Sequence, residues 1–508
     1  MKKTKLLFTS ILFLTGLVVA GIVFAAYQHA GDADKDPATF LKVYPGKAGT
    51  KLDNCALCHT GGTETVNNKT TTYGSCQWCH YKYGYTAPHG DIQLTLNAYG
   101  KAYNDAGRNE AALALIESAD SDGDGYSNIA EINANRYPGD KNDDPSRVVA
   151  PFRIYTKAQL AAMPQHKQFM LMNTTKSGDY YAEYSGVVVE RLLKRAGISP
   201  DATQISAFAP DGYAQRHPMA DSSDNIGKSY APFVIGPYPQ ATYFYNIEAD
   251  KAKTSYGWCD YTSPGNIGRQ NGEPILVKNG LRLILALKAD GVDLVPGVLG
   301  PDNKLTSESE GPFRVVSPQK VVGPPDQAST PGSNQNVIWP YSSANDHNAG
   351  FATKCTTIIR VEPLPAGTTD IDTMEAGWGY IDQGKLVIYG ALQGPQLIFP
   401  ADGDTKANWH PTFFKWRHSP GIERNAVVSY KLEYTKDAAL NDWTAVMIER
   451  SKKKPSEHFD PMVKDNIILT LEPNTKYWWR VTDLDENGGT TVSSIYSFTT
   501  KDKPFKKK

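Results

Sequence analysis

The chain lacks several features, and these absences narrow its class. It lacks an excess of charge, since its 508 residues hold 53 Lys and Arg against 54 Asp and Glu, a formal net charge of −1. This balance gives no case for nucleic-acid binding, and the basic tail at residues 501–508 is interpreted as a solvated end. After residue 26 it also lacks an apolar run long enough to span a bilayer. A chain of this length is expected to form about three domains.

Cysteine is scarce, and four of the six cysteines fall in two copies of Cys-x-x-Cys-His near the start of the chain. This motif is typical of c-type haem attachment, in which two thiols bind the haem vinyl groups and the histidine takes one axial position on iron. The predicted attachment residues are Cys55, Cys58, Cys76 and Cys79, with His59 and His80 as axial ligands. A zinc half-site and a redox dithiol are the alternatives, but zinc does not require the histidine that follows each pair. We therefore predict two haem c groups.

Methionine is absent between Met1 and Met163. A methionine ligand to either iron would therefore have to come from a later domain, which favours histidine in the sixth position of at least one haem. His89, in a loop after the second motif, and His29, near the mature N-terminus, are the candidates. For each of them, an ordinary surface role is the alternative.

The first 26 residues are typical of a signal peptide, with Lys2, Lys3 and Lys5 before an apolar run. An uncleaved membrane anchor is the alternative. Export to the periplasm, the cell surface or the medium agrees with haem attachment outside the cytoplasmic membrane. In that oxidising compartment the two remaining cysteines, Cys259 and Cys355, are predicted to form a disulfide, with two buried thiols as the alternative.

Residues 120–131 fit a twelve-residue calcium loop position by position. The predicted ligands are Asp120, Asp122, Asp124, the carbonyl of Tyr126, Asn128 and Glu131. Calcium binds six or more hard oxygen ligands, which this loop supplies. An acidic turn without an ion is the alternative.

The loop, the segment Leu96–Lys101 and the segment Tyr137–Asp140 together resemble a module of exported bacterial cytochromes. In that module a Cys-x-x-Cys-His motif precedes an Asn-x-Tyr-Gly segment and a calcium loop. The resemblance covers about residues 40–145 and implies haem and calcium without implying a substrate.

The middle of the chain is predicted to carry strands and short helices, among them a helix over Ser185–Ile198 that ends at Gly197 and a strand over Gln204–Ala209. With the later Glu310–Val316 segment, this order resembles the molybdopterin-binding domain of the sulfite oxidase family. The stretch Phe169–Thr175, which corresponds to that family's metal-binding cysteine, contains no cysteine. The resemblance therefore implies the fold and not the metal. The same Glu310 segment and the two haem motifs are similar to a group of exported dihaem proteins with a Gly-Glu-Gly-Pro motif.

The C-terminal part shows short alternating runs separated by turn residues, which predict an all-β domain. Its segment Leu471–Val481 resembles a signature of fibronectin type III domains. The resemblance implies that Tyr477 forms the tyrosine corner and that Trp416 lies inside the sandwich.

The predicted fold class is thus multidomain: a small, mostly helical and loop dihaem domain with a calcium loop, an α+β domain and an immunoglobulin-like sandwich. The predicted boundaries are 1–26 for the signal peptide, 27–148, 149–365, a connector at 366–392, and 393–502. The first functional hypothesis is a dihaem protein that relays electrons to a redox partner protein or an extracellular acceptor, with no catalytic residues of its own. The alternatives are a redox enzyme whose middle domain acts on a substrate, and a surface or matrix interaction protein that carries haems.

Overall fold

The computed structural model describes most of the chain from residue 35 onward. The described residues are 35–48, 50, 52–53, 56–59, 63–66, 69–72, 96–174, 178–209, 213–221, 232–244, 259–297, 306, 308–320, 322, 325, 348–369, 384–419, 427–440, 442–449 and 467–503. The predicted signal peptide, Cys55, Cys76, Cys79 and the histidines His29, His80 and His89 lie outside them. Within the described ranges, no helix combines the length and apolarity needed to cross a bilayer.

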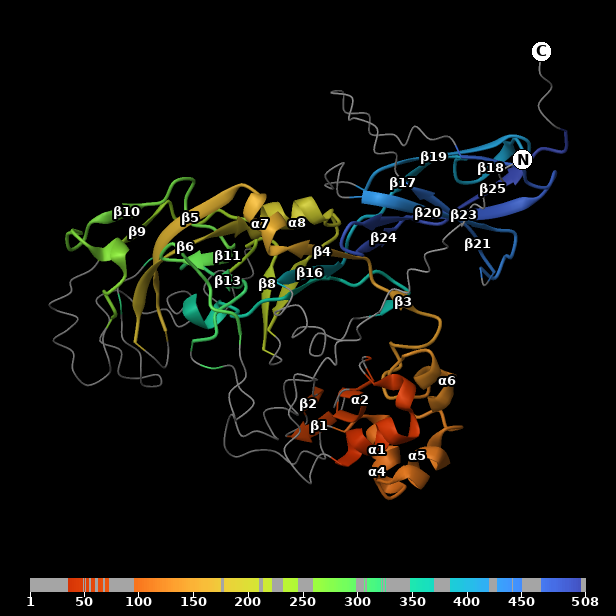
Figure 1. Ribbon diagram of the computed structural model, residues 1–508, viewed down its shortest axis with the longest axis horizontal. Coiled ribbons are helices and arrows are strands. Elements are labelled where there is room, and N and C mark those ends of the chain that lie inside the picture. Colours follow the sequence, from red (N-terminus) through yellow and green to blue (C-terminus); the bar gives the residue numbers. More distant parts are fainter. Residues whose placement is uncertain are drawn as a thin grey trace, which may run out of the picture.

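The N-terminal region is a cluster of short helices, drawn in red and orange in Figure 1. Its elements are α1 (Lys35–Val43), η2 (Pro45–Lys47), α2 (Ala56–His59), the hairpin of β1 (Thr63–Val66) and β2 (Lys69–Thr72), α4 (Ala98–Asp105), α5 (Glu110–Ile116) and α6 (Asn128–Asn133). Asn97, Asn109 and Ser127 each accept a hydrogen bond from a backbone amide as N-caps of α4, α5 and α6. One buried core joins these helices through residues such as Phe40, Leu57, Tyr99, Leu113 and Ile132.

The middle domain consists of two five-stranded sheets around one core (Figure 1). The first has the order β12–β11–β6–β5, with β13 also paired to β11; the second has the order β4–β16–β14–β7–β8. The bounds are β4 (Phe152–Thr156), β5 (Gln165–Met172), β6 (Tyr180–Val188), β7 (Gln204–Phe208), β8 (Ala214–Pro218), β11 (Ile284–Ala289), β12 (Val292–Asp293), β13 (Arg314–Val316), β14 (Ile358–Glu362) and β16 (Lys385–Gly390). Helices α7 (Lys157–Ala162) and α8 (Val189–Ala196) contribute Leu160 and Leu192 to the same core.

Smaller elements complete this domain. They are the paired strands β9 (Ala241–Tyr243) and β10 (Pro274–Leu276), the pair β3 (Val148–Val149) and β15 (Thr368–Thr369), and the 3-10 turns η5 (Pro264–Asn266) and η6 (Asn348–Phe351).

The first four residues of the helix predicted over Ser185–Ile198 belong to a strand. Residues 185–188 belong to β6 and pair with β11, and only Val189–Ala196 are helical, ending at Gly197 with φ 83° as predicted. Gly186 fits the strand because a Cβ there would lie 1.9 Å from the carbonyl oxygen of Leu285. The apolar spacing at helical intervals therefore extended beyond the helix into a strand whose β-branched residues favour a sheet.

The predicted connector at residues 366–392 contains a central strand of the middle domain. Strand β16 pairs in parallel with β14 and antiparallel with β4. The middle domain accordingly extends to about residue 392, where the sequence analysis ended it at 365.

The C-terminal domain is a two-sheet sandwich, drawn in blue in Figure 1. One sheet holds β17 (Gln396–Phe399), β19 (Thr412–Arg417) and β22 (Ile467–Leu469); the other holds β18 (Asp404–Ala407), β20 (Val427–Thr435), β21 (Thr444–Glu449), β23 (Lys476–Asp485), β24 (Thr490–Val492) and β25 (Tyr496–Thr500). Trp416 is fully buried in its core. The backbone amide of Glu472 donates to the hydroxyl oxygen of Tyr477 at 3.0 Å, which is the tyrosine corner that the sequence predicts.

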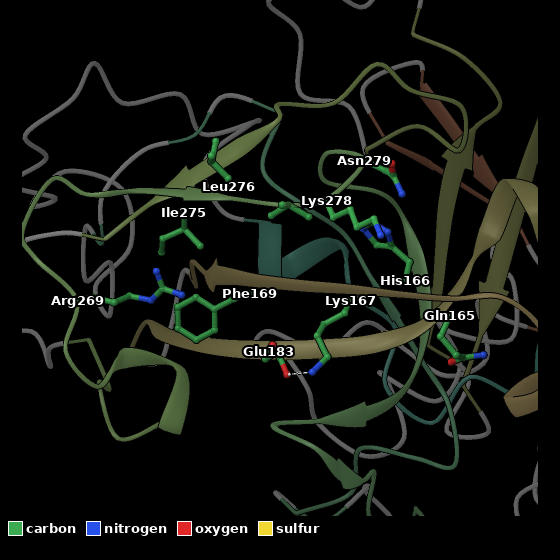
Figure 2. Close-up of a pocket in the computed structure, with 11 residues that line it drawn as sticks. Gln165, His166, Lys167, Phe169, Glu183, Arg269, Ile275, Leu276, Lys278 and Asn279 are labelled. Atoms are coloured by element: carbon green, nitrogen blue, oxygen red, sulfur yellow. Dashed lines mark ion pairs between the residues drawn. The ribbon is translucent and has the colours of Figure 1, made fainter.

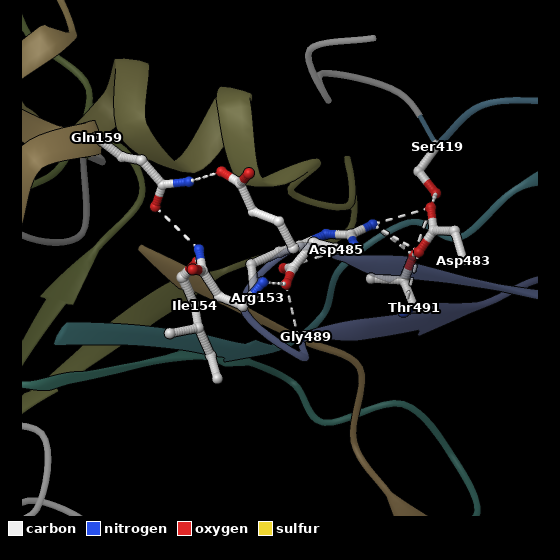
Figure 3. Close-up of polar contacts among 10 residues, drawn as sticks. Arg153, Ile154, Gln159, Ser419, Asp483, Asp485, Gly489 and Thr491 are labelled. Atoms are coloured by element: carbon white, nitrogen blue, oxygen red, sulfur yellow. Dashed lines mark hydrogen bonds and ion pairs between the residues drawn. The ribbon is translucent and has the colours of Figure 1, made fainter. Parts of the chain in front are cut away.

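A buried polar cluster joins the middle and C-terminal domains (Figure 3). Arg153 of β4 donates from Nη2 to both carboxylate oxygens of Asp483 of β23, at 2.9 and 3.0 Å. The hydroxyl groups of Thr491 and Ser419 donate to the same carboxylate, and all four residues are buried. Asn487 donates to the backbone of β4 beside them. Asp483 therefore has a full set of donors from the chain itself.

Candidate metal centre

The acidic loop at residues 120–131 connects α5 to α6 and is organised by its own backbone. Asp120 accepts hydrogen bonds from the amides of Gly123, Asp124 and Gly125 at 2.8 to 3.2 Å. The Gly125 amide is the largest influence that lowers the pKa of this carboxyl group. Gly125 has φ 99°, a conformation that glycine adopts readily and that turns the chain at the sixth loop position. The calcium-loop pattern thus corresponds to a tight turn with its carboxylates on the inner side.

Four carboxylate oxygens in this loop are buried and have no hydrogen-bond partner. They are Oδ2 of Asp122, Oδ2 of Asp124 and both oxygens of Glu131, whose side chain is fully buried. Ligand oxygens of Asp120, Asp122 and Asp124 lie within 4.8 Å of one another. An unpartnered buried carboxylate is costly, so the donor set fits a hard cation with several oxygen ligands.

The electrostatics of the loop agree with that fit. Burial, together with the nearby charges of Asp122 and Asp124, raises the pKa of Glu131 to about 9. Burial and the charge of Asp124 raise the pKa of Asp122 to about 6. Without a cation, the loop therefore holds its carboxylates in an environment that disfavours their ionised forms.

The side chain of Asn128, a predicted calcium ligand, also makes two hydrogen bonds within the domain. Its side-chain oxygen accepts from the amide of Ser121 at 3.2 Å, and its Nδ2 donates to the carbonyl of Ile116 at 2.7 Å. These bonds fasten the loop to α5 and occupy one of the two lone pairs of the amide oxygen that is predicted to bind the ion. Tyr126 stays exposed, and its amide donates to Asp124, which leaves its carbonyl as the predicted ligand.

Two acidic residues that the motif does not include also act on the site. The charge of Asp143 raises the pKa of Glu131, and that of Asp140 raises the pKa of Asp122. Asp143 is buried and accepts from the amide of Tyr137 at 2.9 Å. The acidic stretch that follows α6 is the sequence signal for them, because it carries three Asp within five residues, at 140, 143 and 144.

The described part of the first haem motif is helix α2, which carries Cys58 and His59 at its end. Leu57 is buried, whereas Cys58 and His59 keep partial exposure. Asn97 donates from its amide to the carbonyl of Cys58 at 2.9 Å and from Nδ2 to the carbonyl of Leu57 at 3.0 Å. A Cβ on Gly100 would lie 2.4 Å from the Cys58 carbonyl oxygen. Asn97 and Gly100 thus fix the motif helix against α4.

The surroundings of Cys58 disfavour the thiolate form that a reactive dithiol needs. Burial raises the pKa of the Cys58 thiol to about 12, whereas a redox thiol needs a lowered value. The hydroxyl of the buried Tyr99, whose pKa burial also raises, has no hydrogen-bond partner. Cys58 and His59 are consecutive residues of intermediate exposure, and they lie in the same helical unit as the unpartnered hydroxyl of Tyr99.

The haem motif and the acidic loop belong to one packed unit. Leu57 from α2, Tyr99 and Tyr103 from α4 and Ile132 from α6 lie in the same hydrophobic cluster. A Cβ on Gly139 would lie 2.5 Å from the Asn97 side chain, so the later Tyr137–Asp140 segment also packs on the residue that holds α2. The segments of the cytochrome-like module are therefore neighbours in space.

The predicted disulfide is not present. Cys259 and Cys355 are both buried thiols. Cys259 belongs to a cluster with Phe169 and Phe244, and the amide of Cys355 donates to the carbonyl of Glu310. The alternative of two buried thiols applies, because an even cysteine count does not set the Cα distance that a disulfide requires.

Comparisons with known proteins find partial likenesses to fibronectin type III domains. No protein-family model matches the chain, and no curated protein matches it significantly. A domain of human fibronectin type III domain containing protein 3 is 20% identical and covers 22% of this chain and 86% of its own, with a TM-score of 0.16. The sixth fibronectin type III domain of that protein is 15% identical, covering 23% of this chain and 90% of its own, with a TM-score of 0.14. An alpha-L-rhamnosidase of Streptomyces avermitilis is 14% identical, covering 21% of this chain and 11% of its own, with a TM-score of 0.17. The chain is mostly β-sheet, and its structural neighbours are weak, partial and fibronectin type III-like.

Proposed function

We propose that this chain is an exported dihaem c-type cytochrome that relays electrons, and that calcium stabilises its haem-bearing domain. The observation that carries the proposal is the shared core of α2, which bears Cys58 and His59, and α6, which ends the acidic loop. The resemblance of residues 40–145 to an exported cytochrome module supports it independently. Its partner is a redox protein or an extracellular electron acceptor.

The haem-binding residues follow from the two motifs. Cys55 and Cys58 bind one haem and Cys76 and Cys79 the other, with His59 and His80 as axial ligands. Bound haem supplies one-electron chemistry at iron. The residues of the chain orient it: Asn97 and Gly100 fix the helix that ends in Cys58 and His59. His89 and His29 stay the candidates for the sixth positions.

Calcium has a structural part in this proposal. Asp120, Asp122, Asp124 and Glu131 provide its carboxylate ligands, and the carbonyl of Tyr126 adds a neutral one. Because Ile132 follows Glu131 directly and packs in the core that contains Leu57, neutralising the loop also stabilises the haem motif. Calcium thus stabilises the fold of a small domain.

The test is a count of covalent haems in the full chain made in a host that attaches c-type haem. A haem stain should survive a denaturing gel, and a pyridine haemochrome assay should give two haems per chain. Cys58→Ala and Cys79→Ala should each reduce the covalent attachment at one motif, while Cys259→Ala, at a buried cysteine outside both motifs, should leave the count at two. A wild-type chain without covalent haem would contradict the proposal.

A further inference from the structure

Two adjoining cavities lie beside the first residues of strand β5. The first, about 460 Å³, is bordered by β5, β6 and the segment from Ile275 to Asn279, which begins within β10 (Figure 2). The second, about 530 Å³, is bordered by β5 and α8. Gln165, His166 and Asn279 line both cavities. The two volumes lie in the range of small-ligand sites.

His166 is the buried polar group between the two cavities. Its side chain is 6% exposed, and its Nε2 atom is buried without a hydrogen-bond partner. Leaving such a group unpaired costs free energy, which a hydrogen-bonding ligand in either cavity would offset. Burial lowers the pKa of His166, and the charges of Arg282 and Arg191 lower it further. The surroundings therefore disfavour the protonated, positively charged ring until an anion is present.

The lining is strongly basic. Two acidic side chains line the cavities, those of Glu183 and Glu190. The six basic side chains that line them are Lys167, Arg191, Lys194, Arg269, Lys278 and Arg282. Both acidic groups are already paired, Glu183 with Lys167 at 2.8 Å and Glu190 with Lys194 at 2.6 Å. Among the described residues, Arg191, Lys278 and Arg282 have no carboxylate partner. Three positive charges thus remain on the lining that also carries the unpartnered Nε2 atom of His166.

We propose that these cavities bind a tetrahedral oxyanion, a phosphate or sulfate group, through His166 and the guanidinium groups of Arg191 and Arg282. Guanidinium groups provide paired N–H donors that match oxyanion geometry, and a protonated imidazole adds one more. The excess of positive charge excludes a metal cation. The site lies at the beginning of β5, away from the Asn173 end of that strand, and it does not depend on haem or calcium.

The binding test uses the full chain, with inorganic phosphate as the probe and acetate as the planar, singly charged comparison. Calorimetry at pH 6.5 should detect saturable phosphate binding, at least tenfold tighter than acetate. Glycerol phosphate distinguishes the source of the group: tighter binding than inorganic phosphate indicates an esterified ligand, and weaker binding indicates the free anion. Either result supports the oxyanion site.

Two variants test the assigned residues. Arg191→Gln, at an exposed helix position, and His166→Asn should each weaken phosphate binding by about tenfold or more, since each removes a charge-assisted hydrogen bond. Lys288→Gln removes a half-exposed lysine of the same domain outside both cavities and should leave binding unchanged. The ¹³C signal of labelled histidine that disappears in His166→Asn reports on His166. Phosphate should raise the pKa of His166 that is measured from this signal. Absence of phosphate binding, equal binding of acetate, or unchanged affinity in Arg191→Gln would overturn the proposal.

Discussion

The interdomain cluster around Arg153 and the acidic loop at residues 120–131 both bury carboxylates, but they neutralise them differently. Asp483 receives donors from Arg153, Thr491 and Ser419, all from the chain itself. Glu131 is as deeply buried, and neither of its oxygens has a partner. The chain thus carries its own cation at the domain interface, whereas in the loop the proposed calcium ion would supply the positive charge.

This difference has a physical basis in the cost of burying charge. A carboxylate loses its hydration when buried, and only a matching cation or several donors restore that loss. The interface acquires them once, on folding, whereas the loop acquires them by binding. Stability of the first cluster should therefore be independent of calcium, and stability of the second should follow calcium concentration.

The largest effect is expected at the interface. Arg153→Met would leave Asp483 buried without its cation, which is expected to cost about 3–5 kcal/mol in the free energy of unfolding. Denaturant unfolding of the middle and C-terminal domains, with and without calcium, measures it. The double variant Arg153→Met with Asp483→Leu should recover most of the loss. A single-variant loss below about 1 kcal/mol would mean that the cluster does not hold the domains together.

Removing calcium should have the next largest effect, confined to the N-terminal domain. At a calcium concentration one hundred times the dissociation constant, binding stabilises the folded state by about 2.7 kcal/mol. Thermal unfolding in EDTA and in calcium, followed by the haem absorbance, should show that difference. The Arg153 cluster provides the internal control, because the unfolding of its two domains should not shift. Equal N-terminal stability in both buffers would argue against a bound ion.

A pH dependence of opposite sign to that of most carboxylates is expected in the calcium-free protein. The folded pKa of Glu131, about 9, lies above its ordinary value, so its protonated form is favoured by folding. This contribution to stability is full below about pH 4.5 and is lost as the pH rises towards 9. Unfolding in EDTA between pH 5 and 9 measures it, and Glu131→Gln, which cannot ionise, should flatten the profile. A wild-type profile as flat as that of the variant would show that Glu131 does not titrate in this way.

The smallest effect is expected at an exposed ion pair of the same helical domain. Lys42 and Glu110 lie 2.5 Å apart but are more than half exposed. Lys42→Gln should change the free energy of unfolding by less than about 1 kcal/mol, because solvent screens such pairs. The change should be the same with and without calcium. A larger loss would show that exposure is not what separates weak from strong charge pairs in this protein.

The sequence predicted the fold correctly where its residues fit the pattern of one kind of secondary structure only. The turn residues and alternation near residues 427–500 corresponded to strands, and Tyr477 formed its corner. The prediction was wrong where two signals coincide. Residues 185–188 satisfy both a helical spacing and a strand pattern, and pairing with β11 decides between them.

The candidate metal site could be predicted only for the residues of the acidic loop itself, residues 120–131. Spacing alone located the carboxylates of the loop, since neighbours in sequence form its turn. Spacing could not show that Asn128 bonds to the carbonyl of Ile116, because that contact depends on how α5 packs. It also could not place Asp143, which approaches from beyond α6, or separate Cys259 from Cys355. These outcomes depend on tertiary packing.

The most direct test of the account is a metal and haem count on one preparation of the full chain from a host that attaches c-type haem. After dialysis against metal-free buffer, the account predicts two irons, two covalent haems and one calcium per chain, with the calcium lost in the triple variant that replaces Asp122, Asp124 and Glu131 by their amides. A chain that holds zinc at its Cys-x-x-Cys-His motifs and carries no covalent haem would contradict it.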